Sequence, residues 1–342
     1  METPTSDAWT MEAEGPVGSS VLALRVVYKI FTEYLWIAVT VLALFGNGMS
    51  ILITIQKDNR RISTCSYMTA LAVVDTNVTI ANGWALIWMF WAPAPPSELA
   101  LQGLWYLSYT NAILSGFYLA AMTVDRLIVV RFPMAVPRLC TIRRAWLTIF
   151  IMLVIISGLN IYLFYTFKIT KSGGHTGSVG IVVMSVPDAP EMETLGNMFQ
   201  LVIGTIVPFC IIVFCNLWII TVLRSASKAR DKMGVSEKGK KKSEKESTHL
   251  TRMLIIVSIA YVVTSIPYRL YIVIMGAPEV FAPYKLKEEY WSLRFYCQNY
   301  ILDQFWELNY AINFYLYLIG GGKKYRNDVK EKLRLIFSCC RK

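Results

Sequence analysis

Seven stretches of about 20 mostly apolar residues constrain this chain more than any other feature of its sequence. They cover residues 34–56, 66–90, 101–126, 146–167, 197–223, 253–275 and 296–319. A helix needs a run of about this length to cross the hydrocarbon core of a bilayer. The sequence therefore predicts an all-α membrane protein, built as a seven-transmembrane helix bundle.

The composition of the 342 residues agrees with this prediction. Hydrophobic residues make up 55% of the chain and charged residues 17%, against about 25% charged residues in soluble domains. A chain this apolar is not intrinsically disordered. The net charge of +11 would suggest nucleic acid as a partner only if the basic residues clustered on a soluble face. We therefore expect membrane lipid, and no nucleic acid, as a partner.

The positions of the basic residues predict the orientation of the spans. With the N-terminus outside, 25 of the 34 Lys and Arg residues fall in segments on the inner side, as the positive-inside rule requires. The first 20 residues contain no basic segment followed by an apolar core, so we expect no cleavable signal peptide. We predict a multi-pass protein of the plasma membrane with an extracellular N-terminus.

The predicted organisation has three parts. Residues 1–33 form an extracellular tail, and residues 34–319 form the transmembrane domain, in which 225–250 is a flexible basic inner loop. After Gly320–Gly322, an amphipathic cytoplasmic helix and tail fill residues 320–342, because apolar residues recur there at helical spacing among Lys and Arg. Those apolar residues are Tyr325, Val329, Leu333 and Ile336 with Phe337. Cys339 and Cys340 follow this helix and are candidates for palmitoylation.

Polar residues inside the spans mark functional positions, because a charge in the hydrocarbon core costs several kcal/mol. Counting about 1.5 Å of rise per residue places five of them at similar depth in the inner half. They are Asn47, Asp75, Ser115, Asn309 and Asn313. Such a cluster of oxygen ligands suits a hard cation, and sodium at Asp75 is the candidate. No other cofactor is expected.

A second polar group lies nearer the outer face. Arg269 is about 9 Å deep in span six, and Asp303 and Glu307 share one face of span seven. Two carboxylates on one face repel each other unless a cation lies between them or one of them is protonated. Two interpretations stay open: a structural ion pair with Arg269, or a ligand site that exchanges with that pair. The surrounding candidate residues are Trp84, Trp105, Tyr109, Tyr268, Tyr271, Ile272 and Trp306.

The connection between spans four and five contains two β-prone runs, Lys168–Thr170 and Ile181–Val183, around Gly173-Gly174. This pattern predicts a β-hairpin over the outer opening of the bundle.

These landmarks resemble those of rhodopsin-like (class A) G-protein-coupled receptors over nearly the whole chain. The motifs that carry the resemblance are Gly46-Asn47, Leu71-Ala72-Val73-Val74-Asp75, Asp125-Arg126-Leu127, Trp146, Pro208, Pro267 and Asn313-Phe314-Tyr315-Leu316-Tyr317. Within the family, three segments are similar to invertebrate neuropeptide receptors of the RF-amide and myosuppressin type. These segments are Thr251–Leu254, Ile266–Arg269 and Asn309–Phe314.

The chain also departs from the family pattern. The family's outer disulfide has no counterpart, since Leu101 stands at the first position and residues 168–193 lack cysteine. The span-six tryptophan is Ser265, and the span-five tyrosine is Asn216. Phe314 replaces a proline, so we expect a weaker kink in span seven.

The resemblance implies a receptor that binds an extracellular ligand, with a peptide as the expected class, and activates a heterotrimeric G protein, with arrestin as a further candidate partner. It assigns ligand contacts to Trp105, Tyr109, Tyr268, Arg269, Ile272, Asp303, Trp306 and Glu307. It assigns the switch and G-protein coupling to Asp125, Arg126, Pro208, Pro267 and Tyr317.

Two other functions are compatible with these features. One is a chemosensory or orphan receptor for a small molecule. The other is an ion or solute transporter, but the absence of an evident internal repeat argues against it, because many transporters are built from repeats. A light receptor is excluded because Glu307 stands where opsins carry the retinal-binding lysine. An enzyme is disfavoured because the two histidines, His175 and His249, lie in loops and no Cys/His cluster has metal-ligand spacing.

Overall fold

The computed structural model describes residues 22–24, 26–27, 30–91, 97–173, 179–185, 190–232, 242–275 and 289–339. The predicted tail 1–33 lies mostly outside the described residues.

The elements follow the predicted spans in order. They are η2 (Ile30–Leu35), α2 (Trp36–Thr54), η3 (Asn59–Arg61), α3 (Ser63–Trp91), α4 (Glu98–Arg131), η4 (Pro133–Ala135), α5 (Val136–Leu139), α6 (Ile142–Leu159), η5 (Asn160–Tyr162), α7 (Leu163–Thr166), β1 (Phe167–Gly173), β2 (Val179–Ser185), α8 (Pro190–Leu201), η6 (Val202–Ile206), α9 (Val207–Lys232), α10 (Lys242–Met275), α11 (Glu289–Gly320) and α12 (Lys323–Cys339). Within the described residues, five helical stretches are long and apolar enough to cross a membrane: Trp36–Thr54, Glu98–Arg131, Ile142–Tyr162, Leu195–Ala226 and Thr251–Ile274. The other two predicted spans lie in α3 and α11, which carry Asp75, Asp303 and Glu307. The predicted fold class is confirmed.

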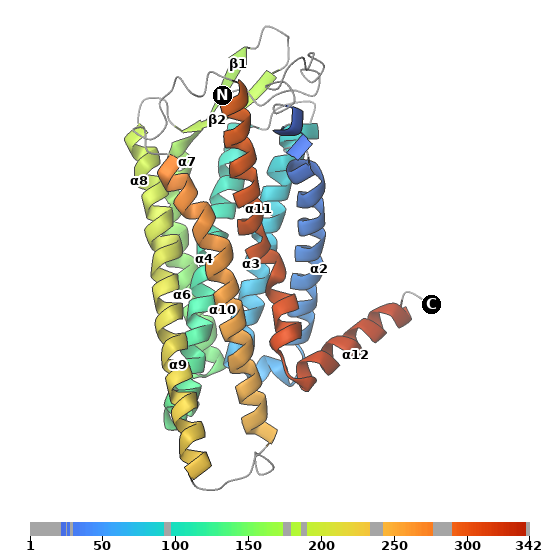
Figure 1. Ribbon diagram of the computed structural model, residues 1–342, viewed down its shortest axis with the longest axis vertical. Helices are drawn as coiled ribbons and strands as arrows, with labels where there is room; N and C mark the ends of the chain where they lie inside the picture. Colours follow the sequence, from blue (N-terminus) through green and yellow to red (C-terminus); the bar gives the residue numbers. More distant parts are fainter. Residues whose placement is uncertain are drawn as a thin grey trace.

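The long helices stand side by side in one bundle (Figure 1). Helix α4 is central and contacts α3, α6, α9 and α10, while α2 packs on α3 and α11. The strands β1 and β2 lie at one end of the bundle, which we call the hairpin end. At the opposite end, the α12 end, α12 turns away from the bundle (Figure 1).

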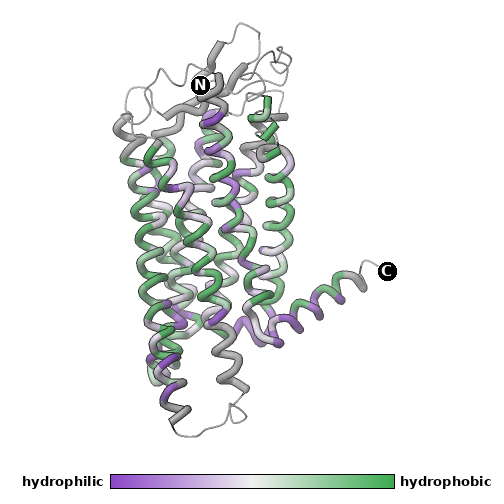
Figure 2. Tube along the Cα trace, viewed as in Figure 1, coloured by the Kyte–Doolittle hydropathy of each residue, from purple (hydrophilic) through white to green (hydrophobic). Residues whose placement is uncertain are grey.

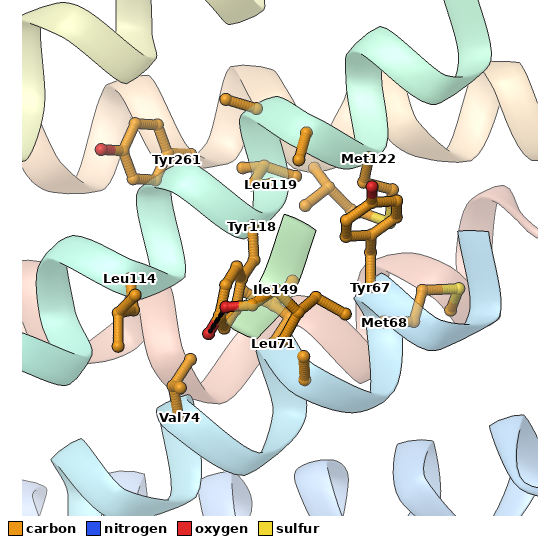
Figure 3. Packing of buried hydrophobic residues seen from close by; sticks show 14 of the residues in the cluster. Tyr67, Met68, Leu71, Val74, Leu114, Tyr118, Leu119, Met122, Ile149 and Tyr261 are labelled. Atoms are coloured by element: carbon orange, nitrogen blue, oxygen red, sulfur yellow. Dashed lines mark hydrogen bonds between the residues drawn. The ribbon is translucent and has the colours of Figure 1, made fainter. Parts of the chain in front are cut away.

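The core lies between helices that are also apolar on their outer faces. Tyr118 is 2% exposed and donates a hydrogen bond of 3.2 Å from its hydroxyl to the carbonyl oxygen of Ile149 (Figure 3). Phe150 and Val154 on α6 are exposed, and hydrophobic residues extend along the helices of the bundle (Figure 2). A helix that is apolar all round suits a bilayer and not water.

The predicted hairpin is present. β1 and β2 pair antiparallel, with Phe167 opposite Ser185 and Gly173 opposite Val179. The turn was predicted at Gly173-Gly174; Gly173 is the last residue of β1, and residues 174–178 lie outside the described residues.

The basic loop predicted over 225–250 is partly helical in the described residues. Helix α9 continues to Lys232 and α10 begins at Lys242, so helix extends into the loop from both sides. The physical reason is that Ala, Lys and Glu, which are frequent in these extensions, favour helix even where they are too polar for a membrane. Residues 233–241 lie outside the described part.

Helix α12 is attached to the bundle by the first part of its apolar face. Val329 is buried in a cluster with Met49, Ile53 and Phe314, and Leu333 packs against this cluster. Asn59 donates hydrogen bonds from Nδ2 to the carbonyl oxygen of Ile53, at 3.0 Å, and to Oδ2 of Asp328, at 3.2 Å. Further along, Ile336 is 40% exposed. The side chains of Phe337 and Cys339, and the whole of Cys340, lie outside the described part.

Two prolines and one glycine shape the bundle locally. Pro208 is the second residue of α9, just after the π-helical turn η6, and Pro267 lies inside α10; a proline cannot donate a helix hydrogen bond. Gly46 lets α2 approach α11 closely, because a Cβ there would lie 3.1 Å from Cβ of Phe314. Helix α11 is continuous through Phe314.

Candidate functional site

Asp75 is the centre of a buried polar layer formed by α3, α4 and α11. Its carboxylate accepts hydrogen bonds from Ser115 Oγ at 2.6 Å and from Asn313 Nδ2 at 2.8 Å. Asp75 has no exposed surface, so these two neutral donors replace water around the carboxylate. We call Asp75, Ser115 and Asn313 the Asp75 layer.

The other two members of the predicted inner cluster are not bonded to Asp75. Asn47 is buried and donates from Nδ2 to the carbonyl oxygen of Tyr310 at 3.0 Å, while its Oδ1 has no hydrogen-bond partner. Asn309 is also buried, one turn before Asn313 on α11. The structure therefore brings three of the five predicted residues together directly.

A second polar layer lies nearer the hairpin end and includes two residues that the sequence did not single out. Asn82 donates from Nδ2 to Oε1 of Glu307. Ser108 donates from Oγ to Oδ1 of Asn82 at 2.5 Å. We call Asn82, Ser108 and Glu307 the Glu307 layer. Helical spacing could have found it, since Asn82 and Ser108 each lie seven residues from a member of the Asp75 layer.

Arg269 contacts aromatic faces. Its guanidinium carbon lies 4.8 Å from the ring centre of Trp306 and 5.6 Å from that of Tyr109, both within cation–π range. Arg269 is 7% exposed, and its Nε has no hydrogen-bond partner. The indole of Trp306 in turn stacks on Tyr268, with ring centres 5.3 Å apart.

Asp303 lies one turn before Glu307 on α11 and is half-buried. The hydroxyl of Tyr268 is hydrogen-bonded to its carboxylate, and Arg269 interacts with it electrostatically. Both carboxylates of the site are thus hydrogen-bonded by neutral side chains.

The remaining predicted ligand contacts are spread over three helices. Trp105 lies 5.7 Å from Tyr109, measured between ring centres, and is half-buried. Tyr271 and Ile272 are half-buried on α10. Trp84 on α3 is 49% exposed.

Asp125 and Arg126 are buried near the α12 end, where α4 meets the start of α3. The Asp125 carboxylate accepts hydrogen bonds from Ser63 Oγ at 2.8 Å and from Thr64 Oγ1 at 2.6 Å. Arg126 donates from Nη2 to the same Thr64 hydroxyl oxygen. Thr64 therefore bridges the acid and the base, a role that the sequence did not suggest because hydroxyls at a helix start are common caps.

Cys140 contacts this pair, and Tyr317 is buried against α12. Cys140 donates from Sγ to the carbonyl oxygen of Asp125 at 3.7 Å. Burial and, to a lesser degree, the Asp125 carboxylate raise the pKa of the Cys140 thiol to about 12. Tyr317 is buried, with its ring centre 6.3 Å from that of Tyr325 on α12.

The departures from the family pattern are also visible. Leu101 is buried, as are Ser265 and Asn216, and neither Ser265 Oγ nor Asn216 Oδ1 has a hydrogen-bond partner. The five cysteines whose side chains the structure describes are free thiols. Among them Cys297 is buried and donates to the carbonyl oxygen of Leu24 at 3.2 Å.

The comparison with protein families decides the classification. The family model of the 7 transmembrane receptors (rhodopsin family) matches residues 46–303, a stretch that contains the seven-helix core down to Asp303. This chain belongs to the rhodopsin family of seven-transmembrane receptors. It is therefore a multi-pass membrane receptor and not an enzyme, and the transporter alternative is set aside.

Individual relatives are more distant. The chain is 26% identical to the human cysteinyl leukotriene receptor 2 over 231 residues, which are 65% of this chain and 60% of the relative. It is 30% identical to the chicken thyrotropin-releasing hormone receptor over 122 residues, 34% of this chain and 30% of the relative. The human thyrotropin-releasing hormone receptor is 29% identical over 130 residues, 37% of this chain and 31% of the relative. The chain thus spans about a third to three fifths of these relatives.

Proposed function

We propose that this protein is a plasma-membrane receptor that binds a peptide at its hairpin end and activates a heterotrimeric G protein at its α12 end. The proposal places the N-terminus outside, because 25 of the 34 basic residues then fall on the inner side. The observation that carries it is the pairing of two buried charged sites. One lies around Arg269 and Glu307 in the hairpin half, and the other lies at Asp125 and Arg126 in the α12 half.

The hairpin-end site offers complementary groups to a ligand. The carboxylates of Asp303 and Glu307 are suited to a cationic group, such as an arginine side chain or an amine. The Nε–H of Arg269 is buried without an acceptor, so a carboxylate or carbonyl of the ligand would satisfy it. Arg269 interacts electrostatically with Asp303, but we favour a ligand site over a purely structural ion pair, because Arg269 also contacts two aromatic faces and its Nε has no hydrogen-bond partner among the described residues.

A peptide is favoured over a small molecule by the hairpin β1–β2, which offers backbone edges at the opening of the bundle. The relatives are named for different ligands, thyrotropin-releasing hormone and cysteinyl leukotriene. A receptor for a small molecule is therefore the second candidate.

At the α12 end, the resting state is held by the hydrogen bonds that join Arg126, Thr64 and Asp125. In the active state Arg126 leaves Thr64 and contacts a helix of the G protein. Pro208 and Pro267 interrupt the hydrogen bonds of α9 and α10 and supply the flexible points for this change. Tyr317 on α11 is a further switch residue in this proposal, because its buried hydroxyl has no hydrogen-bond partner among the described residues and could gain one in the active state.

Sodium fits the Asp75 layer. The buried Asp75 carboxylate has only neutral donors around it, and Asn47 supplies a buried oxygen without a partner. A hard cation prefers such oxygen ligands, and its charge would favour the resting state.

For the C-terminal part of the chain we propose that α12 lies on the membrane, that Cys339 and Cys340 are palmitoylated, and that arrestin is a second intracellular partner.

The test is a peptide-library screen of cells that express the receptor with a promiscuous G-protein reporter. A parallel screen of small molecules and a control without ligand are included. We expect peptide agonists whose potency falls when Asp303, Glu307 and Arg269 are replaced singly at equal surface expression. Unchanged potency in all three variants would exclude this pocket, and agonists only among small molecules would exclude the peptide class.

A further inference from the structure

Two side chains outside the predicted site connect Glu307 to two other helices. Asn82 of α3 donates to Oε1 of Glu307, and Ser108 of α4 donates to Oδ1 of Asn82. Because the amide oxygen is occupied by the Ser108 hydroxyl, the amide NH2 group is directed at the carboxylate. The hydrogen bond from Asn82 is made to one carboxylate oxygen of Glu307, Oε1. The chain of bonds therefore orients the carboxylate through that oxygen.

The Glu307 layer repeats the composition of the Asp75 layer on the same three helices. Each layer contains one carboxylate, one carboxamide and one serine of α4. The acid and the amide come from opposite helices in the two layers. In the Glu307 layer, α3 carries the amide, Asn82, and α11 carries the acid. In the Asp75 layer, α3 carries the acid and α11 carries the amide, Asn313. The layers lie seven residues apart on α3, a rise of about 10 Å. In both, a carboxamide orients a buried carboxylate.

An apolar layer separates the two carboxylates. Val78 of α3, Ala112 of α4 and Tyr310 of α11 are buried together with Trp306 in one cluster. Trp306 also lies under the guanidinium of Arg269. Glu307 is thus assigned to the Arg269 side of this apolar layer, and Asp75 to the other side.

We propose that Asn82 and Ser108 are positioning residues that hold Glu307 as a fixed anionic subsite for the cationic group of the ligand. This inference rests on the proposed function. A free glutamate loses side-chain entropy when it binds a cation, whereas a carboxylate already oriented by Asn82 binds it at lower cost. The oriented carboxylate then accepts hydrogen bonds from the cationic group of the ligand.

The experiment measures the electrostatic potential beside Glu307 without a known ligand. The full-length receptor carries Asp303→Cys, since residue 303 is half-buried one turn from Glu307 on the same face of α11. Its rate of modification is measured with cationic 2-aminoethyl and anionic 2-sulfonatoethyl methanethiosulfonate, and the receptor without this cysteine gives the background. The ratio of the two rates reports the charge that faces the thiol. The negative charge of Glu307, roughly 6 Å from the thiol in a hydrated pocket, should change the ratio of the two rates about tenfold.

We expect Glu307→Gln to lower the ratio about tenfold, and Asn82→Leu and Ser108→Ala to lower it about threefold or more. Ser108→Thr retains the hydroxyl and should keep the ratio. Asn111→Leu is the matched control, because Asn111 bonds to Asn77 and to the carbonyl of Leu107. If Glu307→Gln lowers the ratio while Asn82→Leu and Ser108→Ala do not, the positioning role is overturned and the acidic pocket stands. If Asp303→Cys is not modified above background, or if Glu307→Gln does not change the ratio, both the positioning role and the acidic pocket are overturned.

Discussion

Among the residues that the structure describes, two arginines are buried in the bundle, one towards each end, and their surroundings differ in kind. Arg126 shares the Thr64 hydroxyl with Asp125, its neighbour in the sequence. Arg269 lies over the rings of Trp306 and Tyr109, while Asp303 and Glu307 are hydrogen-bonded by Tyr268 and Asn82. Among the described residues, the Nε of each arginine lacks a hydrogen-bond partner, and a buried charge is costly unless it is paired. The difference is that Arg126 shares a hydroxyl with its acid, whereas the described contacts of Arg269 are mainly aromatic, which is why the proposed function gives the hairpin-end site, and not the α12-end site, to the ligand.

The largest effect should come from the α12 end. Arg126→Ala removes the group that contacts the G protein in the proposed mechanism, so agonist-stimulated signalling should fall at least a hundredfold. The reporter response at equal surface expression measures this. Full signalling by the variant would show that Arg126 is only a structural partner of Thr64.

The second-largest effect is expected at Arg269, in the hairpin-end site. Arg269→Met keeps an unbranched side chain on the aromatic faces but removes the charge and the Nε donor. Agonist potency should fall tenfold to a hundredfold, since hydrogen bonds to charged groups contribute about 1.5–3 kcal/mol. Dose–response curves measure it. Arg269→Lys is the matched control, because it keeps the charge and loses the planar fork. If agonist potency is unchanged in Arg269→Met, the ligand does not bind to Arg269.

The third change tests the Thr64 hydroxyl in the α12-end site. Thr64→Val removes the hydroxyl that Arg126 and Asp125 share, at nearly constant volume. Basal signalling should rise about five- to tenfold, because one to two buried hydrogen bonds of about 1 kcal/mol hold the resting state. Ser63→Ala, which removes a bond to Asp125 only, should raise it less. Equal basal signalling in the native receptor, Thr64→Val and Ser63→Ala would show that the Thr64 hydroxyl does not stabilise the resting state.

A smaller effect is expected at Asp75, between the two arginines. Sodium should weaken agonist affinity several-fold in the native receptor and have no effect in Asp75→Asn. Radioligand competition in sodium and in N-methylglucamine buffers measures the difference. The same sodium response in both receptors would place the ion elsewhere.

The smallest effect concerns Cys140. Because its pKa is raised to about 12, the reactive thiolate is scarce below that pH in the folded receptor. Labelling by a maleimide should therefore stay slow between pH 7 and pH 9 and become fast after denaturation, when the pKa returns towards 9. Mass spectrometry of the labelled peptide reports this, and fast labelling of Cys140 in the folded receptor would contradict its burial.

Sequence reasoning predicted part of the candidate site correctly. Asp75, Ser115 and Asn313 were placed at one depth by counting residues, and the structure joins them by hydrogen bonds. Counting succeeds because the rise per residue of a helix is constant. The same count included Asn47, which bonds instead to the backbone of Tyr310, because depth does not fix the direction in which a side chain points.

Asn82, Ser108 and Thr64 were not singled out from the sequence, although helical spacing links the first two to the Asp75 layer. An asparagine, a serine or a threonine inside a span is a common residue, and each matters here only through its partner. Arg269 was expected to lie near carboxylates, and it interacts electrostatically with Asp303; its position directly over the rings of Tyr109 and Trp306 could not be read from the sequence. These outcomes depend on how α3, α4, α10 and α11 are rotated about their axes.

The sequence by itself determined the seven spans, the hairpin and the depth of each buried charge, since these depend on local composition and on the fixed geometry of single helices. The tertiary structure alone decided which polar groups meet. Asp75 and Glu307 each acquired an amide from another helix, and Arg126 acquired the hydroxyl of Thr64, which is 62 residues away. Hydrogen bonds act over about 3 Å, so they follow from the packing of helices and not from the pattern along any one of them.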